Sequence, residues 1–219
     1  MPEMLDHYAA VVFDFDGTLA DSFAAIASSV NHVRASRGLT ELGVEEVKRH
    51  VGRGPEYLLT HTVPGGVLAD DIARYRAHHP SVMMPLTSLL PGAAALVHAL
   101  HRRGKKVGLC SNKPRFFSQR LLKHLALADL FAVVVGPEDV PRPKPAPDML
   151  LLAVERLGFL KPQVLYIGDM TVDIQTARSA GVAVWVVPTG TEDRRVLANA
   201  QPDRLLADLQ ELADEIERA

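Results

Sequence analysis

Several features that mark particular classes of protein are absent from this 219-residue chain or scarce in it. It contains one cysteine, Cys110, so no disulfide can form within the chain, which fits a reducing compartment. Lysine and arginine (24) do not outnumber aspartate and glutamate (26), and the net charge of −2 lacks the basic excess on which nucleic-acid binding relies. No run of about 18 apolar residues occurs, and the first residues form no signal segment. We therefore expect a cytoplasmic protein with a small-molecule partner, no nucleic acid and no membrane contact, and an open oligomeric state.

Apolar residues are plentiful, at 47% of the chain, and their pattern predicts the fold class. Short apolar segments alternate with stretches of helical periodicity, and the apolar segments are continuous rather than alternating. This pattern is typical of an α/β fold, a Rossmann-like parallel sheet with helices on both faces. The predicted strands lie within 11–13, 106–110, 132–135, 164–167 and 183–187, and the predicted helices within 93–103, 114–125, 147–157, 172–180 and 208–218.

The segment 22–84 interrupts this alternation and is far longer than a loop between two core elements. Its apolar residues recur at helical spacing, which predicts a small bundle of helices. We expect this bundle to form a cap over the end of the first strand, with residues 1–21 and 85–219 forming the core. Pro80, Pro85 and Pro91 are expected to mark the return of the chain to the core.

Two carboxylates, Asp14 and Asp16, follow the first predicted strand directly and precede Gly17 and Thr18. Asp-Gly alone is typical of an ordinary turn. A buried parallel strand, however, places its last residues at the edge where open α/β sheets bind ligands. Two like charges there repel each other unless a cation joins them.

Further polar groups follow the later predicted strands. Each has a simpler interpretation when taken alone: a helix cap, a solvated loop lysine or a strand-ending turn. Taken together they place several polar groups where one ligand would touch them all. These groups are Ser111 and Asn112, Lys144, and Asp169 and Asp173.

The charges of this set indicate a metal ion. Four aspartates and one lysine would repel a phosphate monoester, which is itself a dianion. A divalent cation removes this conflict, and oxygen ligands together with substrate phosphate suit Mg²⁺.

Four segments resemble, in this order and over essentially the whole chain, the motifs of the haloacid dehalogenase-like phosphatases: Asp14-Phe15-Asp16-Gly17-Thr18, Ser111-Asn112, Lys144-Pro145 and Gly168-Asp169-Met170-Thr171-Val172-Asp173. The resemblance implies that Mg²⁺ is bound by the Asp14 side chain, the Asp16 backbone carbonyl and the Asp169 side chain. Asp173 would be a direct ligand or would act through another ligand.

The same residues suggest a mechanism. The Asp14 carboxylate would attack phosphorus and form an aspartyl-phosphate. Asp16, with a raised pKa, would protonate the leaving alkoxide and later deprotonate the attacking water. Lys144 would keep Asp14 ionised and, with Ser111, would meet the charge of the phosphoryl group.

The remaining candidates are expected to bind substrate. Gly17 would let the backbone approach the phosphate, Thr18 would cap or orient the acid, and Asn112 would lie beside Ser111. In the cap, Arg53 lies between two glycines and offers a guanidinium to a substrate carboxylate, although a helix-ending turn with a surface arginine is the simpler interpretation. Within the family, this loop and the motifs are most similar to the phosphoglycolate phosphatases, which makes 2-phosphoglycolate the expected substrate.

Other functions remain open at this stage. The same family includes β-phosphoglucomutase-like phosphoryl transfer and the hydrolysis of pyrophosphate or sugar phosphates. A signalling module that accepts phosphate on an aspartate is the alternative outside enzymes. The long cap and Asp16 argue against such a module.

Overall fold

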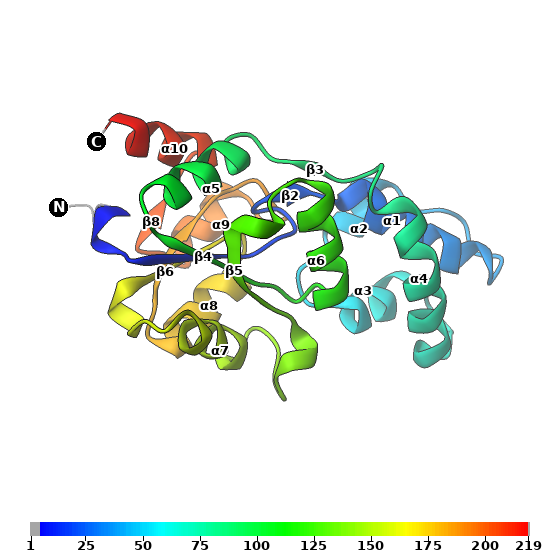
Figure 1. Cartoon of the computed structure of the whole chain (residues 1–219). Helices are drawn as coiled ribbons and strands as arrows, with labels where there is room; N and C mark the ends of the chain where they lie inside the picture. Colours follow the sequence, from blue (N-terminus) through cyan, green and yellow to red (C-terminus); the bar gives the residue numbers. More distant parts are fainter. Residues whose placement is uncertain (1–4, 219) are drawn as a thin grey trace.

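The computed structural model describes residues 5–218, and its core is a parallel sheet (Figure 1). The strand order is β5-β4-β1-β6-β7-β8, and every neighbouring pair is parallel. The strands span Ala10–Phe13 (β1), Lys106–Cys110 (β4), Phe131–Val135 (β5), Val164–Gly168 (β6), Ala183–Val186 (β7) and Arg204–Leu205 (β8). The predicted α/β fold class is thus confirmed, while residues 1–4 of the predicted core lie outside the described residues.

The central strand β1 is buried along its whole length, because it has a neighbour on each side and helices on both faces. Val11 lies opposite Val107 of β4 and Leu165 of β6. Val11 belongs to the hydrophobic cluster on one face of the sheet, and Val12 belongs to the cluster on the other. This double burial explains why the strand is continuously apolar.

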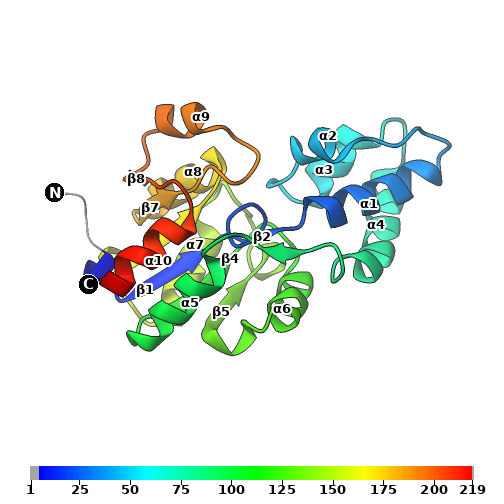
Figure 2. The ribbon, with the colours of Figure 1, turned by 90° about the horizontal axis from the view of Figure 1, so that it is seen from above.

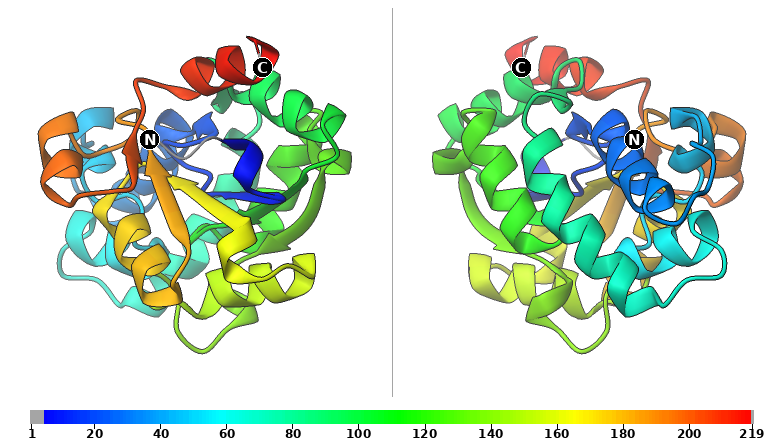
Figure 3. Two further views of the ribbon diagram at one scale, coloured as in Figure 1. Left: turned by 90° about the vertical axis from the view of Figure 1, so that its left-hand side faces the viewer. Right: turned by 90° about the vertical axis from the view of Figure 1, so that its right-hand side faces the viewer.

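Helices cover both faces of the sheet (Figure 3). Residues of α5, α6 and α10 join the cluster on one face, and residues of α7, α8 and α9 join the cluster on the other. These helices span Ala93–Arg102 (α5), Arg115–His124 (α6), Asp148–Leu157 (α7), Thr171–Ala180 (α8), Arg194–Asn199 (α9) and Leu209–Arg218 (α10), with short 3-10 turns at Leu5–His7, Ala128–Leu130, Pro137–Asp139 and Lys161–Gln163.

Four further helices lie to one side of the sheet (Figure 2) and have a hydrophobic cluster of their own. They are α1 (Phe23–Ala35), α2 (Val44–Lys48), α3 (Pro55–Thr62) and α4 (Leu68–Val82). The chain leaves the core through β2 (Ala20–Asp21) and returns through β3 (Ser88–Leu89). These two strands pair in antiparallel fashion, so the outgoing and returning chains are joined at the base of the helical group. We call α1–α4 the cap; its domain boundaries at residues 22 and 84 stay a prediction.

One local prediction is wrong, because Pro80 lies inside α4 rather than at the return to the core. A proline in a helix removes one backbone hydrogen bond and crowds the preceding turn. The neighbouring His79 and Met83 are fully buried, and their packing keeps the last turn helical despite this loss. None of the helices in residues 5–218 combines the length and apolar character needed to cross a membrane.

Candidate active site

Three polar residues directly follow three adjacent strands of the sheet. Asp14 comes after β1, Ser111 after β4 and Asp169 after β6. The hydrogen bonding between β1 and β6 continues to Asp14, because the Asp14 N–H donates to the Ile167 carbonyl at 2.9 Å. The two neighbours of β1 belong to different halves of the chain, so the carboxyl end of β1 is the switch point where open α/β sheets bind ligands.

Lys144 is the buried cation of this cluster. Its Nζ lies 3.0 Å from Asp14 Oδ1 and 2.7 Å from Asp173 Oδ1, and its side chain is 1% exposed. It also donates to the Tyr166 hydroxyl at 3.0 Å. Burial by itself would lower the pKa of Lys144, but the two carboxylates outweigh burial and raise it. The lysine therefore stays charged.

Asp14 remains largely ionised at neutral pH. Burial raises its pKa to about 6, the Lys144 ammonium opposes this shift, and Asp173 adds to it. Hydrogen bonding by Ser111 also lowers the pKa of Asp14. The carboxylate is thus poorly solvated yet charged, as a nucleophile must be.

Asp169 is fully buried and has one oxygen without a hydrogen-bond donor in the described structure. Thr18 donates to its Oδ1 at 2.7 Å, whereas its Oδ2 has no partner. Burial, followed by the charges of Asp173 and Asp14, raises the pKa of Asp169 well above its usual range. Two glycines leave room around Oδ2, since a Cβ on Gly17 would lie 2.6 Å from it and one on Gly190 would overlap it.

These observations fit a divalent cation. Carboxylate oxygens of Asp14, Asp169 and Asp173 lie within 4.8 Å of one another. A cation would relieve their repulsion and would supply the partner that Asp169 Oδ2 lacks. Oxygen-only ligands suit hard divalent ions such as Mg²⁺, Ca²⁺ and Mn²⁺.

Asp173 differs from the other acids because both of its oxygens are engaged. Oδ2 accepts hydrogen bonds from the backbone N–H groups of Asp169 (3.1 Å) and Met170 (3.0 Å), which caps α8. Oδ1 accepts from Lys144 at 2.7 Å and from Tyr166 at 3.0 Å. Asp173 therefore fastens the end of β6 to Lys144, and direct metal coordination by Asp173 stays a prediction.

Asp16 is paired with Lys113. The Lys113 Nζ donates to Asp16 Oδ1 at 2.8 Å and to Oδ2 at 3.1 Å, and the Ser22 hydroxyl also donates to Oδ1. Both side chains are largely buried, with 4% of Lys113 and 11% of Asp16 exposed. Asp16 is thus held at the boundary between the sheet and the cap.

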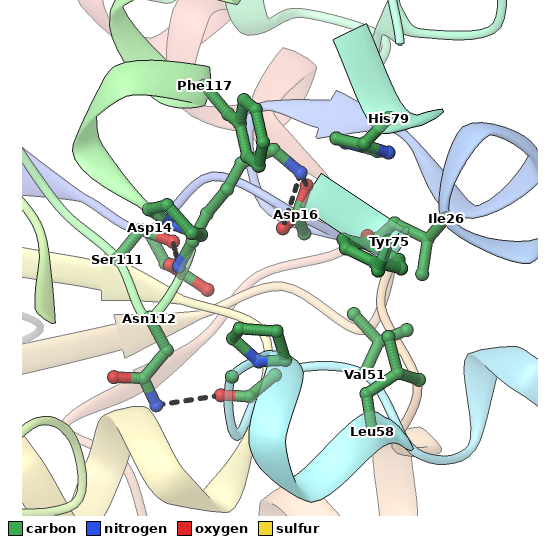
Figure 4. A pocket seen from close by; sticks show the side chains of 15 residues that line it. Asp14, Asp16, Ile26, Val51, Leu58, Tyr75, His79, Ser111, Asn112 and Phe117 are labelled. Carbon is green, nitrogen blue, oxygen red and sulfur yellow. Dashed lines mark hydrogen bonds and ion pairs between the residues drawn. The ribbon is translucent and has the colours of Figure 1, made fainter. Parts of the chain in front are cut away.

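A pocket of about 480 Å³ lies between the strand ends and the cap (Figure 4). The core contributes the polar side chains Asp14, Asp16, Ser111, Asn112 and Lys113. The cap contributes mainly apolar and aromatic side chains, namely Ile26, Val51, Leu58, Tyr75 and His79. Figure 4 shows both groups facing the same space.

Two of the predicted substrate-binding residues contact other protein groups in this structure. Asn112 donates to the carbonyls of Gly52 (3.0 Å) and Lys144 (3.1 Å) and accepts from the Lys144 N–H (3.0 Å). Arg53 is exposed, is not among the pocket-lining residues, and has its guanidinium 5.1 Å from the Tyr57 ring. The structure does not bring Arg53 to the pocket, and its contact with substrate stays a prediction.

A model of the haloacid dehalogenase-like hydrolases matches residues 11–187. The chain belongs to this family. A phosphoglycolate phosphatase of Rhodospirillum rubrum is 37% identical over 192 residues, which cover 83% of this chain and 80% of that relative. A phosphoglycolate phosphatase of Salmonella typhi is 32% identical over 223 residues, covering 91% of this chain and 88% of the relative. A crystal structure from Bacteroides fragilis, assigned to the haloacid dehalogenase-like hydrolases, is 34% identical, with a TM-score of 0.85 over 94% of this chain and 99% of that one.

The pocket residues of this hydrolase that were not predicted from the sequence include Lys113 and His79. Lys113 carried a usable signal, since it stands one residue after Asn112 at the end of a buried strand. His79 carried none, because the adjacent His78 looks the same in sequence and only the packing of α4 separates a buried ring from a half-buried one.

Proposed function

We propose that this protein is a Mg²⁺-dependent phosphatase that hydrolyses a small phosphate monoester through an aspartyl-phosphate on Asp14. The observation that carries the proposal is the placement of the Asp14 carboxylate, 3.0 Å from the Lys144 ammonium and within one buried cluster with Asp169. A charged carboxylate with little water around it, next to a fixed cation, suits attack on phosphorus.

The metal would be held by the side chains of Asp14 and Asp169 and the backbone carbonyl of Asp16, with Asp173 as a further candidate. Bound there, Mg²⁺ would neutralise the acids and the negative charge of the phosphoryl oxygens. Thr18 would keep Asp169 oriented toward the metal through its 2.7 Å hydrogen bond.

The reaction would proceed in two steps. An Asp14 oxygen forms a bond to phosphorus while the bond between phosphorus and the ester oxygen breaks. Asp16, which must be protonated when the ester is bound, gives its proton to the leaving alkoxide and becomes a carboxylate. Asp16 then takes a proton from a water molecule that attacks phosphorus and releases phosphate from Asp14. Lys144 and Ser111 would stabilise the charge on the phosphoryl oxygens in both steps.

Among small monoesters we propose 2-phosphoglycolate as the substrate. The support comes from the names of the relatives, which cover most of this chain. The pocket adds that polar groups and a lysine lie on the core side and that the cap closes the other side with apolar groups. Such a pocket favours a small leaving group that carries a charged end near Lys113.

The test is a panel of phosphate esters assayed with and without Mg²⁺. The wild type should release phosphate from 2-phosphoglycolate more efficiently than from sugar phosphates, and only with Mg²⁺. Asp14→Asn should abolish this release, and activity that persists in the purified variant would contradict the mechanism.

Arg53→Ala in the same panel tests the predicted cap contact. A selective loss on carboxylate-bearing esters would support the contact, and equal activity on all esters would reject it.

A further inference from the structure

His79 is a buried histidine of the cap that faces the pocket. It lies on α4, its exposed fraction is 0%, and it lines the same cavity as Asp14 and Asp16 (Figure 4). The ring is fixed by its neighbours, because it stacks on Tyr75 with ring centroids 5.1 Å apart and meets Phe117 edge-on at 5.0 Å. A side chain held in this way has one defined direction.

The two ring nitrogens of His79 differ in their surroundings. Nδ1 lies 3.0 Å from the Ser29 hydroxyl, whereas Nε2 is buried and has no hydrogen-bond partner among the described residues. A buried polar atom without a partner costs stability and needs a reason in a native structure. A ligand that occupies the pocket would supply the missing partner.

The imidazole is neutral, and its single proton can lie on either nitrogen. Burial, assisted by the nearby Lys113 ammonium, lowers the pKa of His79 to about 3. The Ser29 hydroxyl lies 3.1 Å from the Ala25 carbonyl, 3.0 Å from His79 Nδ1 and 3.3 Å from His78 Nδ1. The Ala25 carbonyl lies inside α1, where the backbone N–H four residues on is its helical donor, so it does not depend on the hydroxyl proton. When Ser29 donates to His79 Nδ1 instead, the ring proton lies on Nε2 and points into the pocket.

Lys113 gives this donor a charged neighbour. It is the one lysine or arginine among the described residues that line the pocket, and it lies close enough to lower the pKa of His79 by its charge. Two of its contacts go to Asp16, and an ammonium group has three N–H donors. An anionic group near Lys113 and His79 would therefore meet two donors and one positive charge.

We propose that His79 is a specificity-determining residue whose Nε2–H donates a hydrogen bond to a carboxylate on the leaving group of the substrate. This inference rests on the proposed phosphatase function and adds to it the cap residue that distinguishes one ester from another. Ser29 is the positioning residue, since its hydroxyl holds Nδ1 and thereby sets which nitrogen carries the proton. Arg53, which lies outside the pocket, is not needed for this contact.

Two substitutions separate the two nitrogens. In His79→Asn the amide takes the place of Nδ1 and nothing replaces Nε2, whereas in His79→Gln the amide reaches the position of Nε2. The substrates are 2-phosphoglycolate and ethyl phosphate, which are similar in size but differ in the carboxylate. We expect His79→Asn to lower the ratio of kcat/KM for 2-phosphoglycolate to that for ethyl phosphate by about tenfold to a hundredfold, because a hydrogen bond to a charged group is lost.

Most of this loss should appear as a higher KM for 2-phosphoglycolate, and His79→Gln should restore most of the ratio. The matched control is His98→Asn, because His98 is exposed on α5 and does not line the pocket, so the ratio should stay that of the wild type. A ratio that is the same in His79→Asn and the wild type would overturn the proposal. So would a loss that His79→Gln shares in full.

Failure of the proposed function would look different. A wild type that hydrolyses neither ester with Mg²⁺ would contradict the phosphatase assignment. In that case a binding measurement still tests the proposed contact of His79, because titration calorimetry of 2-phosphoglycolate with the Asp14→Asn protein needs no turnover. Adding His79→Asn should raise the dissociation constant about tenfold or more, and equal constants would overturn the proposal.

Discussion

Gly190 is the residue that leaves room for the free oxygen of Asp169. A Cβ at this position would overlap Asp169 Oδ2, the atom we assign to the metal. Gly190→Ala should therefore raise the Mg²⁺ concentration needed for half-maximal phosphatase activity about tenfold, as substitutions beside metal ligands do. Gly43→Ala is the control, since a Cβ there would meet nothing within 4 Å. An unchanged Mg²⁺ requirement in Gly190→Ala would place the metal elsewhere.

His79 should also make the protein sensitive to acid. Its pKa is about 3 in the folded protein against an ordinary value of 6.5, so as pH falls the unfolded chain takes up the proton first. Its contribution to stability is complete above about 6.5 and is lost as pH falls from there toward about 3. Between pH 7 and pH 5 the free energy of unfolding should fall about 2 kcal/mol more in the wild type than in His79→Phe.

The measurement is urea unfolding of both proteins at the two pH values. Asp14 and Asp169 titrate in both proteins, so the comparison removes their contribution. Equal pH dependence in the two proteins would show that the ring is not held neutral by burial.

At the scale of elements, Asn112 links three loops. Its amide joins the end of β4 to the cap loop at Gly52 and to both backbone groups of Lys144. Asn112→Ala removes three hydrogen bonds and leaves buried Lys144 backbone groups without a partner, so the free energy of unfolding should fall by about 2–3 kcal/mol. Urea unfolding checks this, with the exposed Asn199 at the end of α9 as the control position for the same substitution. A loss no greater than that of Asn199→Ala would show that the link is dispensable.

The placement of residues at strand ends could be predicted from the sequence, and the placement of the cap residues could not. Asp14, Ser111 and Asp169 each follow a buried apolar strand, and parallel strands bring their carboxyl ends to one edge whatever the details of packing. Arg53 shows the limit of this reasoning. Whether a loop arginine reaches the pocket or a neighbouring tyrosine depends on how the cap helices pack.

Dependence on distant packing also explains why the predictions for Pro80 and Thr18 were wrong or incomplete. Pro80 was expected to mark the return of the chain to the core, but it lies inside α4, where the burial of His79 and Met83 outweighs the low helix preference of proline. Thr18 was expected to cap or orient an acid, and its partner proves to be Asp169 at the end of β6, far along the chain. The residues next to a position in the sequence do not indicate which distant residue it will contact.

At the scale of the whole molecule, the pocket exists because the cap is inserted directly after β1. The chain leaves and re-enters the core through the paired strands β2 and β3, and β2 starts four residues after Asp16. The cap is therefore tied to the same end of the sheet as the acids. A core that supplies the chemistry and a cap that supplies selectivity would explain why polar residues line one side of the pocket and mainly apolar ones line the other.

The central claim is that Asp14 carries the phosphoryl group during turnover. The most direct test is to mix the enzyme with 2-phosphoglycolate and Mg²⁺, quench the reaction in acid within a single turnover, and analyse the peptides by mass spectrometry. We predict that the peptide containing Asp14 gains the mass of one phosphoryl group, and that Asp14→Asn shows no such gain. Turnover with no phosphoryl group on this peptide, or with the phosphoryl group on another residue, would contradict the account.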